Sequence, residues 1–300
     1  MAIIKVSNLT KRYRDTVAVD GVSFAVDRGE IFGILGPNGA GKTTTVEAIA
    51  GLRQPDSGTI EVLGRTPGDP ELLRQVGVQL QESELPEKMT VREALELYSA
   101  FYPEPLDWRR LAAELGLEDR HHARYATLSG GQKQRLSIAL ALIGDPSIAI
   151  LDELTTGLDP QARRDTWDLI ESIRDRGVTV LLVTHFMAEA ERLCDRIAVI
   201  DHGRVVALDT PAGLVARVAT EQRIRLRPSA ELDDALLTAL PEVREVRRHG
   251  STVEVIGADN LLHAVSSVLA AHQIIAADLR LEQASLDDAF VGLTGRGAEN

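Results

Sequence analysis

Two groups of residues in this sequence have the types and the spacing for phosphate chemistry. The first is the run GPNGAGKT, which fits the pattern G-x-x-x-x-G-K-[ST] and directly follows the apolar run IFGIL. Its glycines let backbone N–H groups turn toward one point, and the start of the following helix adds partial positive charge there. We expect Lys42 on the β- and γ-phosphates of a nucleotide and the Thr43 hydroxyl on Mg²⁺. The residues assigned to the nucleotide are Gly36, Pro37, Asn38, Gly39, Ala40, Gly41, Lys42, Thr43 and Thr44.

The second group is the pair of adjacent acids Asp152 and Glu153, which follows the apolar run SIAIL. Adjacent carboxylates at the end of a buried run are unfavourable unless a cation or a proton is present. Alone, such a pair more often forms a solvated turn. A phosphate loop needs a second acidic element, and this favours Asp152 as a magnesium ligand and Glu153 as the group that activates water.

A further helix start is suited to phosphate. The run LSGGQ, Leu128–Gln132, begins a long amphipathic pattern, and Ser129 is suited to cap the helix. Its candidate site residues are Ser129, Gly130, Gly131 and Gln132.

An α/β domain positions these residues. The apolar runs 31–35, 147–151, 178–183 and 196–200 do not alternate with polar residues, as expected for a parallel sheet that is covered on both faces. Helical patterns at 42–52, 130–143 and 161–177 lie between them. The segment from about 83 to 128 has helical spacing and no strand signal, so we predict a helical insertion.

The character of the sequence changes after Pro211. Strand patterns at 223–227, 243–249, 251–257 and 274–282 alternate with helical patterns at 231–240 and 260–272, and a last helix follows at 285–295. The order strand–helix–strand–strand–helix–strand predicts a small α+β domain of the ferredoxin-like class. We predict one domain over 1–215 and a second over 216–300.

Composition limits the partners and the compartment. The 300 residues are 44% hydrophobic and 26% charged, which is typical of a globular protein, and the net charge of -12 disfavours nucleic acid. The lone Cys194 fits a reducing compartment and is expected in the core, while His121 and His122 are expected to be solvated. No signal peptide or run of 18 apolar residues is apparent, so we expect a soluble chain that only a partner holds at a membrane.

Taken in order, these motifs resemble the ATP-binding subunit of ABC transporters over about residues 1–215. The resemblance implies that Tyr13 stacks on adenine and that Gln81, in VGVQLQES, touches Mg²⁺ and senses the transmembrane partner. It also implies that Asp159 lies in a loop that crosses to a second subunit, and that His185 contacts the γ-phosphate. The register of the motif excludes the nearby Gln79.

The resemblance further implies a head-to-tail homodimer and a membrane permease as partners. ATP on one phosphate loop is then capped by the LSGGQ segment of the other subunit, and hydrolysis drives transport from the cytoplasmic face of the membrane, where the subunit is peripheral. The insertion is the part expected to dock on the permease. Its candidate contacts, for which packing inside the insertion is an equal alternative, are Leu95, Tyr98, Phe101 and Tyr102.

Two longer runs favour a subgroup. The run THFMAEAERLCDRIAVIDHGRVVALDTP and the ending SLDDAFVGLTG resemble the daunorubicin/doxorubicin-type subunits of ABC-2 exporters, which implies export of a drug, an antibiotic or a lipid. The cargo stays open. The alternative is a soluble ABC ATPase, but the insertion is too short for a long coiled coil and there is one set of motifs. A regulatory protein without turnover is disfavoured by Glu153 and His185.

Leu154 departs from the family pattern, which usually has proline directly after the catalytic glutamate. Proline fixes φ and removes a donor, whereas leucine restores an N–H group and some freedom. We expect slower or less tightly coupled hydrolysis at most, with ATP binding retained.

Overall fold

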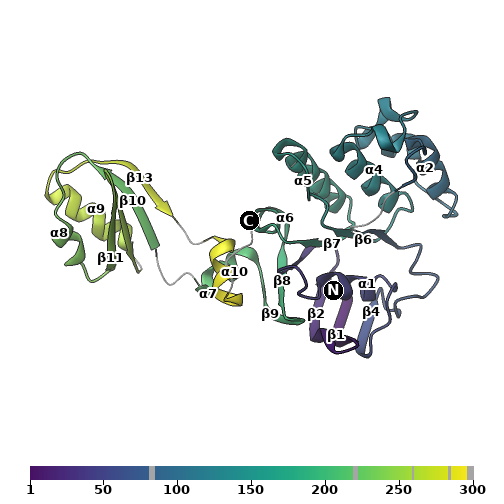
Figure 1. Cartoon of the computed structure of the whole chain (residues 1–300), viewed down its shortest axis with the longest axis horizontal. Coiled ribbons are helices and arrows are strands. Elements are labelled where there is room, and N and C mark those ends of the chain that lie inside the picture. Colours follow the sequence, from purple (N-terminus) through teal and green to yellow (C-terminus); the bar gives the residue numbers. More distant parts are fainter. Residues whose placement is uncertain (81–84, 219–221, 259, 283–284, 296–300) are drawn as a thin grey trace. The chain divides into compact units, whose positions relative to one another are not determined.

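The computed structural model describes residues 1–80, 85–218, 222–258, 260–282 and 285–295. The chain divides into one unit that comprises Met1–Pro211 and a second unit that begins at Ala212 (Figure 1).

A six-stranded sheet forms the centre of the first unit. Its order is β5 (Val76–Gln79), β6 (Ile148–Asp152), β7 (Thr179–Thr184), β3 (Ile31–Leu35), β8 (Arg196–Asp201) and β9 (Arg204–Asp209). The first five strands are parallel, and β9 pairs antiparallel with β8. Every residue of β3, β6 and β7 is buried, which confirms the covered parallel sheet that their unbroken apolar runs predict.

Different layers cover the two faces of this sheet. On one face lie helix α1 (Lys42–Ile49) and an antiparallel sheet of β2 (Thr16–Asp27), β1 (Ala2–Tyr13) and β4 (Ser57–Val62), which the sequence analysis does not predict. On the other face α4 (Gly130–Leu142), α5 (Pro160–Asp175) and α6 (Met187–Leu193) pack on the central strands (Figure 1). The phosphate-loop helix and the LSGGQ helix thus lie on opposite faces.

The insertion is helical, as predicted, over the part that the structure describes. It contains α2 (Val91–Ser99), α3 (Trp108–Glu114) and two short 3₁₀ turns, Glu118–Arg120 and Tyr125–Thr127. Thr90 and Glu93 form a capping box that starts α2. Both α2 and α3 pack against α4, so the insertion is anchored to the helix that begins at LSGGQ.

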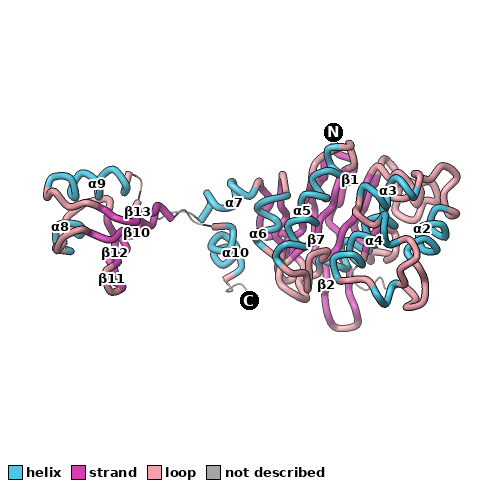
Figure 2. The backbone as a smooth tube through the Cα atoms, turned by 90° about the horizontal axis from the view of Figure 1, so that it is seen from above, coloured by secondary structure: helices cyan, strands magenta, loops and turns pink. Residues whose placement is uncertain are grey.

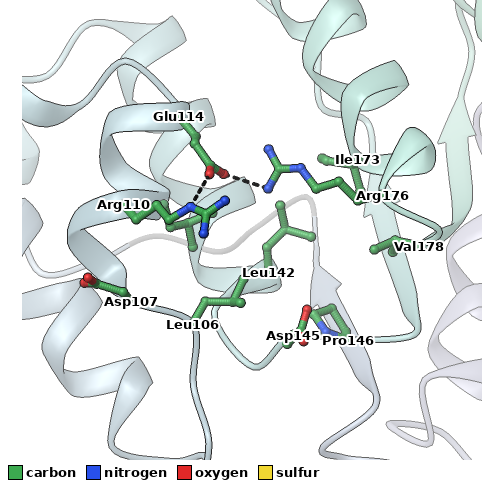
Figure 3. A pocket seen from close by; sticks show the side chains of 11 residues that line it. Leu106, Asp107, Arg110, Glu114, Leu142, Asp145, Pro146, Ile173, Arg176 and Val178 are labelled. Carbon is green, nitrogen blue, oxygen red and sulfur yellow. Dashed lines mark hydrogen bonds and ion pairs between the residues drawn. The ribbon is translucent and has the colours of Figure 1, made fainter.

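A pocket lies where α3 and the carboxyl ends of α4 and α5 meet (Figure 3). Glu114 holds two arginines there: it accepts a hydrogen bond from Arg110 at 2.9 Å and pairs with Arg176 at 2.7 Å. Pro146 and Val178, which also line the pocket, precede β6 and β7. The pocket is therefore at the end of the parallel strands opposite to Asp152.

The second unit has its own core. Its elements are α7 (Pro211–Val218), β10 (Gln222–Pro228), α8 (Asp234–Thr238), β11 (Val243–His249), β12 (Thr252–Gly257), α9 (Leu261–Ala271), β13 (Ala276–Glu282) and α10 (Leu286–Thr294). The antiparallel sheet has the order β11-β12-β10-β13, and α8 and α9 cover one face of it (Figure 2). Helix α8 is shorter than predicted because Asp233 caps it by accepting a hydrogen bond from the Ala235 N–H. No helix of the described residues is long and apolar enough to cross a bilayer.

Candidate functional site

The phosphate loop follows β3 and ends at the second residue of α1. Gly41 has φ 100°, and a Cβ there would lie 2.2 Å from the carbonyl oxygen of Ala18, so the position requires glycine. Lys42 is buried, and its Nζ donates to the carbonyl oxygens of Gly36 at 2.8 Å and Pro37 at 3.0 Å. Burial lowers the pKa of Lys42, while the nearby carboxylates of Glu153 and Asp152 oppose this shift. The loop is thus wrapped around a buried ammonium group.

Distant segments that no sequence motif indicates support this loop. The Gly203 N–H, in the turn between β8 and β9, donates to the Ala40 carbonyl at 2.9 Å. In turn the Asp20 N–H of β2 donates to the Gly203 carbonyl at 2.8 Å. The sequence DHG marks the turn, but nothing local in it indicates which loop the turn supports.

Tyr13 is the last residue of β1, at the hairpin that joins β2. Its ring is 37% exposed, and the Arg53 guanidinium lies 5.3 Å from the ring centroid. Tyr13 pairs with Thr16, two residues before the Ala18 carbonyl that adjoins the phosphate loop. The ring is therefore accessible beside the loop, and its stacking on adenine stays a prediction.

Asp152 ends β6 as a buried acid. The residue is 1% exposed, and neither carboxylate oxygen has a hydrogen-bond partner within the described part of the chain. Burial, followed by the charge of Glu153, raises the pKa of Asp152 to about 6, and Lys42 opposes this shift. A desolvated carboxylate without a partner fits a hard cation such as Mg²⁺. The exposed Thr43 at the start of α1 adds a hydroxyl oxygen of the same kind.

Gln81, the other predicted magnesium ligand, lies outside the described residues. Gln79, which the motif register excludes, is buried at the end of β5. Its Oε1 accepts a hydrogen bond from the Asp152 N–H at 3.3 Å. Gln79 therefore holds the backbone of the acid pair in place.

The two residues assigned to catalysis come together although 32 positions separate them. His185 follows β7, and its Nδ1 lies 3.1 Å from Oε1 of Glu153. The Glu153 N–H donates to the Val183 carbonyl at 2.9 Å, which fixes the end of β6 against β7. Glu153 has φ 50°, a left-handed conformation that is uncommon for a residue with a side chain and is typical of strained functional sites.

Leu154 is fully buried. The residue that departs from the family pattern is therefore packed in the interior. Its effect on turnover stays a prediction.

The LSGGQ segment forms the predicted helix start. Ser129 caps α4, with its Oγ accepting from the Gln132 N–H at 3.3 Å and Gln132 Oε1 accepting from the Ser129 N–H at 3.0 Å. A Cβ at Gly130 would lie 3.5 Å from Leu158, and one at Gly131 would lie 3.4 Å from Ala162. The segment thus adjoins the loop before α5.

Asp159 in that loop has a local structural role. Its carboxylate accepts hydrogen bonds of 2.9 Å from the N–H groups of Gln161 and Ala162, so it caps α5, with Pro160 in the first turn. The exposed position agrees with the expected role at a subunit interface, which stays a prediction.

Some predictions about other residues need correction. Leu95 is fully buried, which favours packing inside the insertion over a permease contact, whereas Phe101 is 67% exposed. His121 is half-buried and its ring packs edge-on against Trp108, so it is not solvated as predicted. Cys194 is buried as expected, and burial raises the pKa of its thiol.

Fold and site together define an α/β P-loop ATPase. The family model described as "ABC transporter" matches residues 19–156. Nod factor export ATP-binding protein I of Ralstonia nicotianae is 40% identical over 98% of this chain and 94% of its own length, and that of Paraburkholderia xenovorans is 40% identical over 98% of both. The chain belongs to the ABC transporter family of ATP-binding subunits, and it hydrolyses ATP in a reaction coupled to transport.

Solved structures of the family agree with the fold. An ATP-binding subunit of an ABC transporter is 33% identical, with a TM-score of 0.64 over 72% of this chain and 92% of its own. A bacterial ABC transporter cassette solved as a dimer is 28% identical, with a TM-score of 0.63 over 69% of this chain and 98% of its own.

Proposed function

We propose that the phosphate loop, Asp152, Glu153 and His185 form the hydrolytic half of an ATP site. The 3.1 Å contact between Glu153 and His185, at the ends of neighbouring strands, carries this proposal. Lys42 and the start of α1 hold the phosphates, Glu153 takes the proton of the attacking water, and His185 holds the carboxylate of Glu153 and the γ-phosphate. Thr43, Asp152 and Gln81 would hold Mg²⁺, which when bound neutralises charge on the β- and γ-phosphates.

We further propose that the site is completed by a second copy of the chain. Helices α1 and α4 cover opposite faces of the central sheet, which favours use of the Ser129–Gln132 segment on the nucleotide of the partner. Asp159 then lies at the crossing between the subunits. A cassette solved as a dimer is among the similar structures, which supports a dimer for this chain.

Replacing Glu153 with Gln tests both parts of the proposal. The amide keeps the shape but cannot accept the proton of water, so we expect turnover to fall by about a hundredfold or more while ATP still binds. Size-exclusion chromatography with ATP should show a dimer that retains nucleotide. Glu191→Gln, at an exposed position of α6, is the matched control and should turn over normally. A Glu153→Gln variant that stays monomeric in saturating ATP contradicts the head-to-tail dimer of the isolated subunit.

The transported substrate is proposed from the relatives. Their printed names assign them to Nod factor export, which favours export over a soluble role for this chain as well. We propose a peripheral subunit at the cytoplasmic face of the membrane that powers an ABC-2-type permease, with a drug, an antibiotic or a lipid as cargo. The exposed Phe101 is the candidate permease contact. Phe101→Ser should prevent co-purification with the permease and leave the ATPase rate of the isolated subunit unchanged. Co-purification of the variant at the normal yield contradicts this contact.

The second unit is proposed as an accessory domain of the ferredoxin-like class, over about 216–300. Its separate core and its strand order support this assignment. It braces the dimer, docks on the partner or regulates turnover. Truncation after Pro211, with ATPase and transport measured separately, distinguishes these roles: loss of transport alone indicates docking.

A further inference from the structure

A buried acid lies behind the loop that carries His185. Glu189, in α6, is fully buried, and its Oε1 accepts a hydrogen bond of 2.9 Å from the indole Nε1 of Trp167 in α5. Burial raises the pKa of Glu189, and the hydroxyl of Thr184, directly before His185, is among the groups that oppose this shift. A buried carboxylate is unfavourable, and the hydrogen bond from Trp167 offsets part of that cost.

A second contact joins α5 to Phe186, the residue directly after His185. The Arg163 guanidinium lies over the ring of Phe186, 4.6 Å from its centroid, and the ring of Phe186 lies 4.1 Å from that of His185. Arg163 and Trp167 are four residues apart in α5, so they lie on one face of that helix. One face of α5 therefore contacts Phe186, directly after His185, and Glu189, in the helix that follows.

The start of α5 is the loop that adjoins LSGGQ. Asp159 caps the helix, and the Arg163 N–H donates to the Asp159 carbonyl at 3.0 Å. Arg163, one turn after the cap, contacts Phe186. Trp167, one further turn along α5, contacts Glu189. A short rigid connection therefore joins the Asp159 loop to the loop of His185.

We propose that Trp167 and Glu189 are positioning residues for His185, and that they pass the position of the Asp159 loop to the Glu153–His185 pair. When a second subunit engages Asp159, α5 moves as one body and brings the histidine loop with it. This inference rests on the roles proposed above for Glu153 and His185. It adds a link between the subunit interface and the hydrolytic residues of the same chain.

A double-mutant cycle in the full chain tests the link. Trp167→Phe removes the donor and Glu189→Leu removes the acceptor, while Glu189→Gln keeps an acceptor oxygen. We expect Trp167→Phe and Glu189→Leu each to lower kcat by about tenfold, since small displacements of reacting groups have effects of that size, with the Kd of ATP within about twofold. The double variant should be no slower than either single variant, and Glu189→Gln should stay close to the normal rate.

Matched controls exist for both residues. Trp108→Phe and Glu191→Leu replace the other tryptophan and an exposed glutamate of α6, and both should keep the normal rate. In the Trp108→Phe background Trp167 is the only tryptophan, and we expect its emission to change on addition of Mg²⁺ and ATP unless Glu189 is replaced by Leu. If Glu189→Leu does not fold, the kcat of Trp167→Phe still tests the link, because Trp167 is half-buried and its replacement is milder.

Several results overturn the link: a normal kcat in both single variants, losses that multiply in the double variant, or a loss of ATP affinity that equals the loss of kcat. The Glu153→Gln variant distinguishes failure of this link from failure of the proposed hydrolytic site. If Glu153→Gln keeps its turnover, the hydrolytic assignment fails. If Glu153→Gln is inactive while Trp167→Phe is normal, only the link fails.

Discussion

Two clusters of charged side chains lie at opposite ends of the same parallel strands, and their polar groups are treated differently. At the carboxyl end of β6, Asp152 is buried, and neither of its oxygens has a hydrogen-bond partner within the described residues. Beside it Glu153 has a left-handed backbone. At the amino end, Glu114 is part of the pocket wall, is 30% exposed, and is paired with both Arg110 and Arg176.

Asp152 has the properties of a ligand-binding acid, whereas Glu114 is a structural acid that joins α3 to the end of α5. Glu114 has its partners in the folded chain, so it contributes modestly to the contact between α3 and α5. Asp152 has none in the described chain, so folding leaves an unfavourable charge that a bound cation relieves. Sites that bind or react are expected to violate the rule that buried polar groups are satisfied, and structural contacts are expected to obey it.

The largest effect is expected from removing the charge of the phosphate loop. Lys42→Ala takes away the buried ammonium, and we expect the affinity for ATP to fall by about a hundredfold, in line with the loss of a close charge-assisted contact. A fluorescent ATP analogue measures the Kd. Lys5→Ala, at an exposed ion pair with Glu61, is the control and should bind normally. Normal ATP affinity of Lys42→Ala would remove this loop from the nucleotide site.

A pH-dependent gain in stability is expected from Asp152→Asn. The pKa of Asp152 is raised in the folded state from 3.8 to about 6, so ionisation opposes folding. The stability that goes with the protonated form is present below pH 3.8 and is lost as the pH rises through 6. The asparagine variant has no such loss. Relative to the wild type, its free energy of unfolding without nucleotide should rise between these pH values by about 1–3 kcal/mol and stay constant above them.

Urea unfolding at several pH values measures this difference. Asp145→Asn, at an exposed residue of the opposite pocket, is the matched control for the replacement of an aspartate that is not buried. If Asp152→Asn gains nothing above pH 6, the acid is already satisfied without a cation, and the contrast between the two ends disappears.

A smaller effect is expected at the opposite end. Glu114→Gln weakens both ion pairs, and because the side chain is 30% exposed the loss of stability should be about 0.5–1 kcal/mol. The ATPase rate should not change. Glu96→Gln, which disrupts an exposed pair with Arg92 on α2, is the control for the loss of a single surface pair. A lower kcat of Glu114→Gln would show that this pocket is coupled to the hydrolytic site.

Much of the first unit can be predicted because its signals are local. The phosphate loop, the acid pair and the helix start at LSGGQ are each contiguous in sequence, and the central strands are unbroken apolar runs. The sheet of β1, β2 and β4 is missed, because register shifts interrupt the period of the long β1 and β2, so that a regular alternation is confined to the end of β2. The contact between Glu153 and His185 follows from the family motifs alone and from no local rule.

The long-range contacts that hold the phosphate loop and the His185 segment in place cannot be predicted from the sequence. Gly203 and Ala40 are 163 positions apart, and no property of either residue predicts the bond between them. Glu189 reads as an ordinary polar residue of a surface helix until its burial is known. Packing decides which face of α6 is inside, and packing depends on the whole fold.

The smallest change in turnover is expected from Leu154→Pro, which restores the residue usual in the family. The turn is already fixed before this position, because the Glu153 N–H is bonded to the Val183 carbonyl and Leu154 itself is buried. We therefore expect turnover to rise by about threefold at most, with unchanged ATP affinity, and stability to fall by about 1–3 kcal/mol through lost packing. Leu154→Met keeps the volume and the N–H group, so it separates packing from backbone freedom. An unchanged rate of Leu154→Pro would show that the contacts of Glu153, and not the residue after it, hold the catalytic turn.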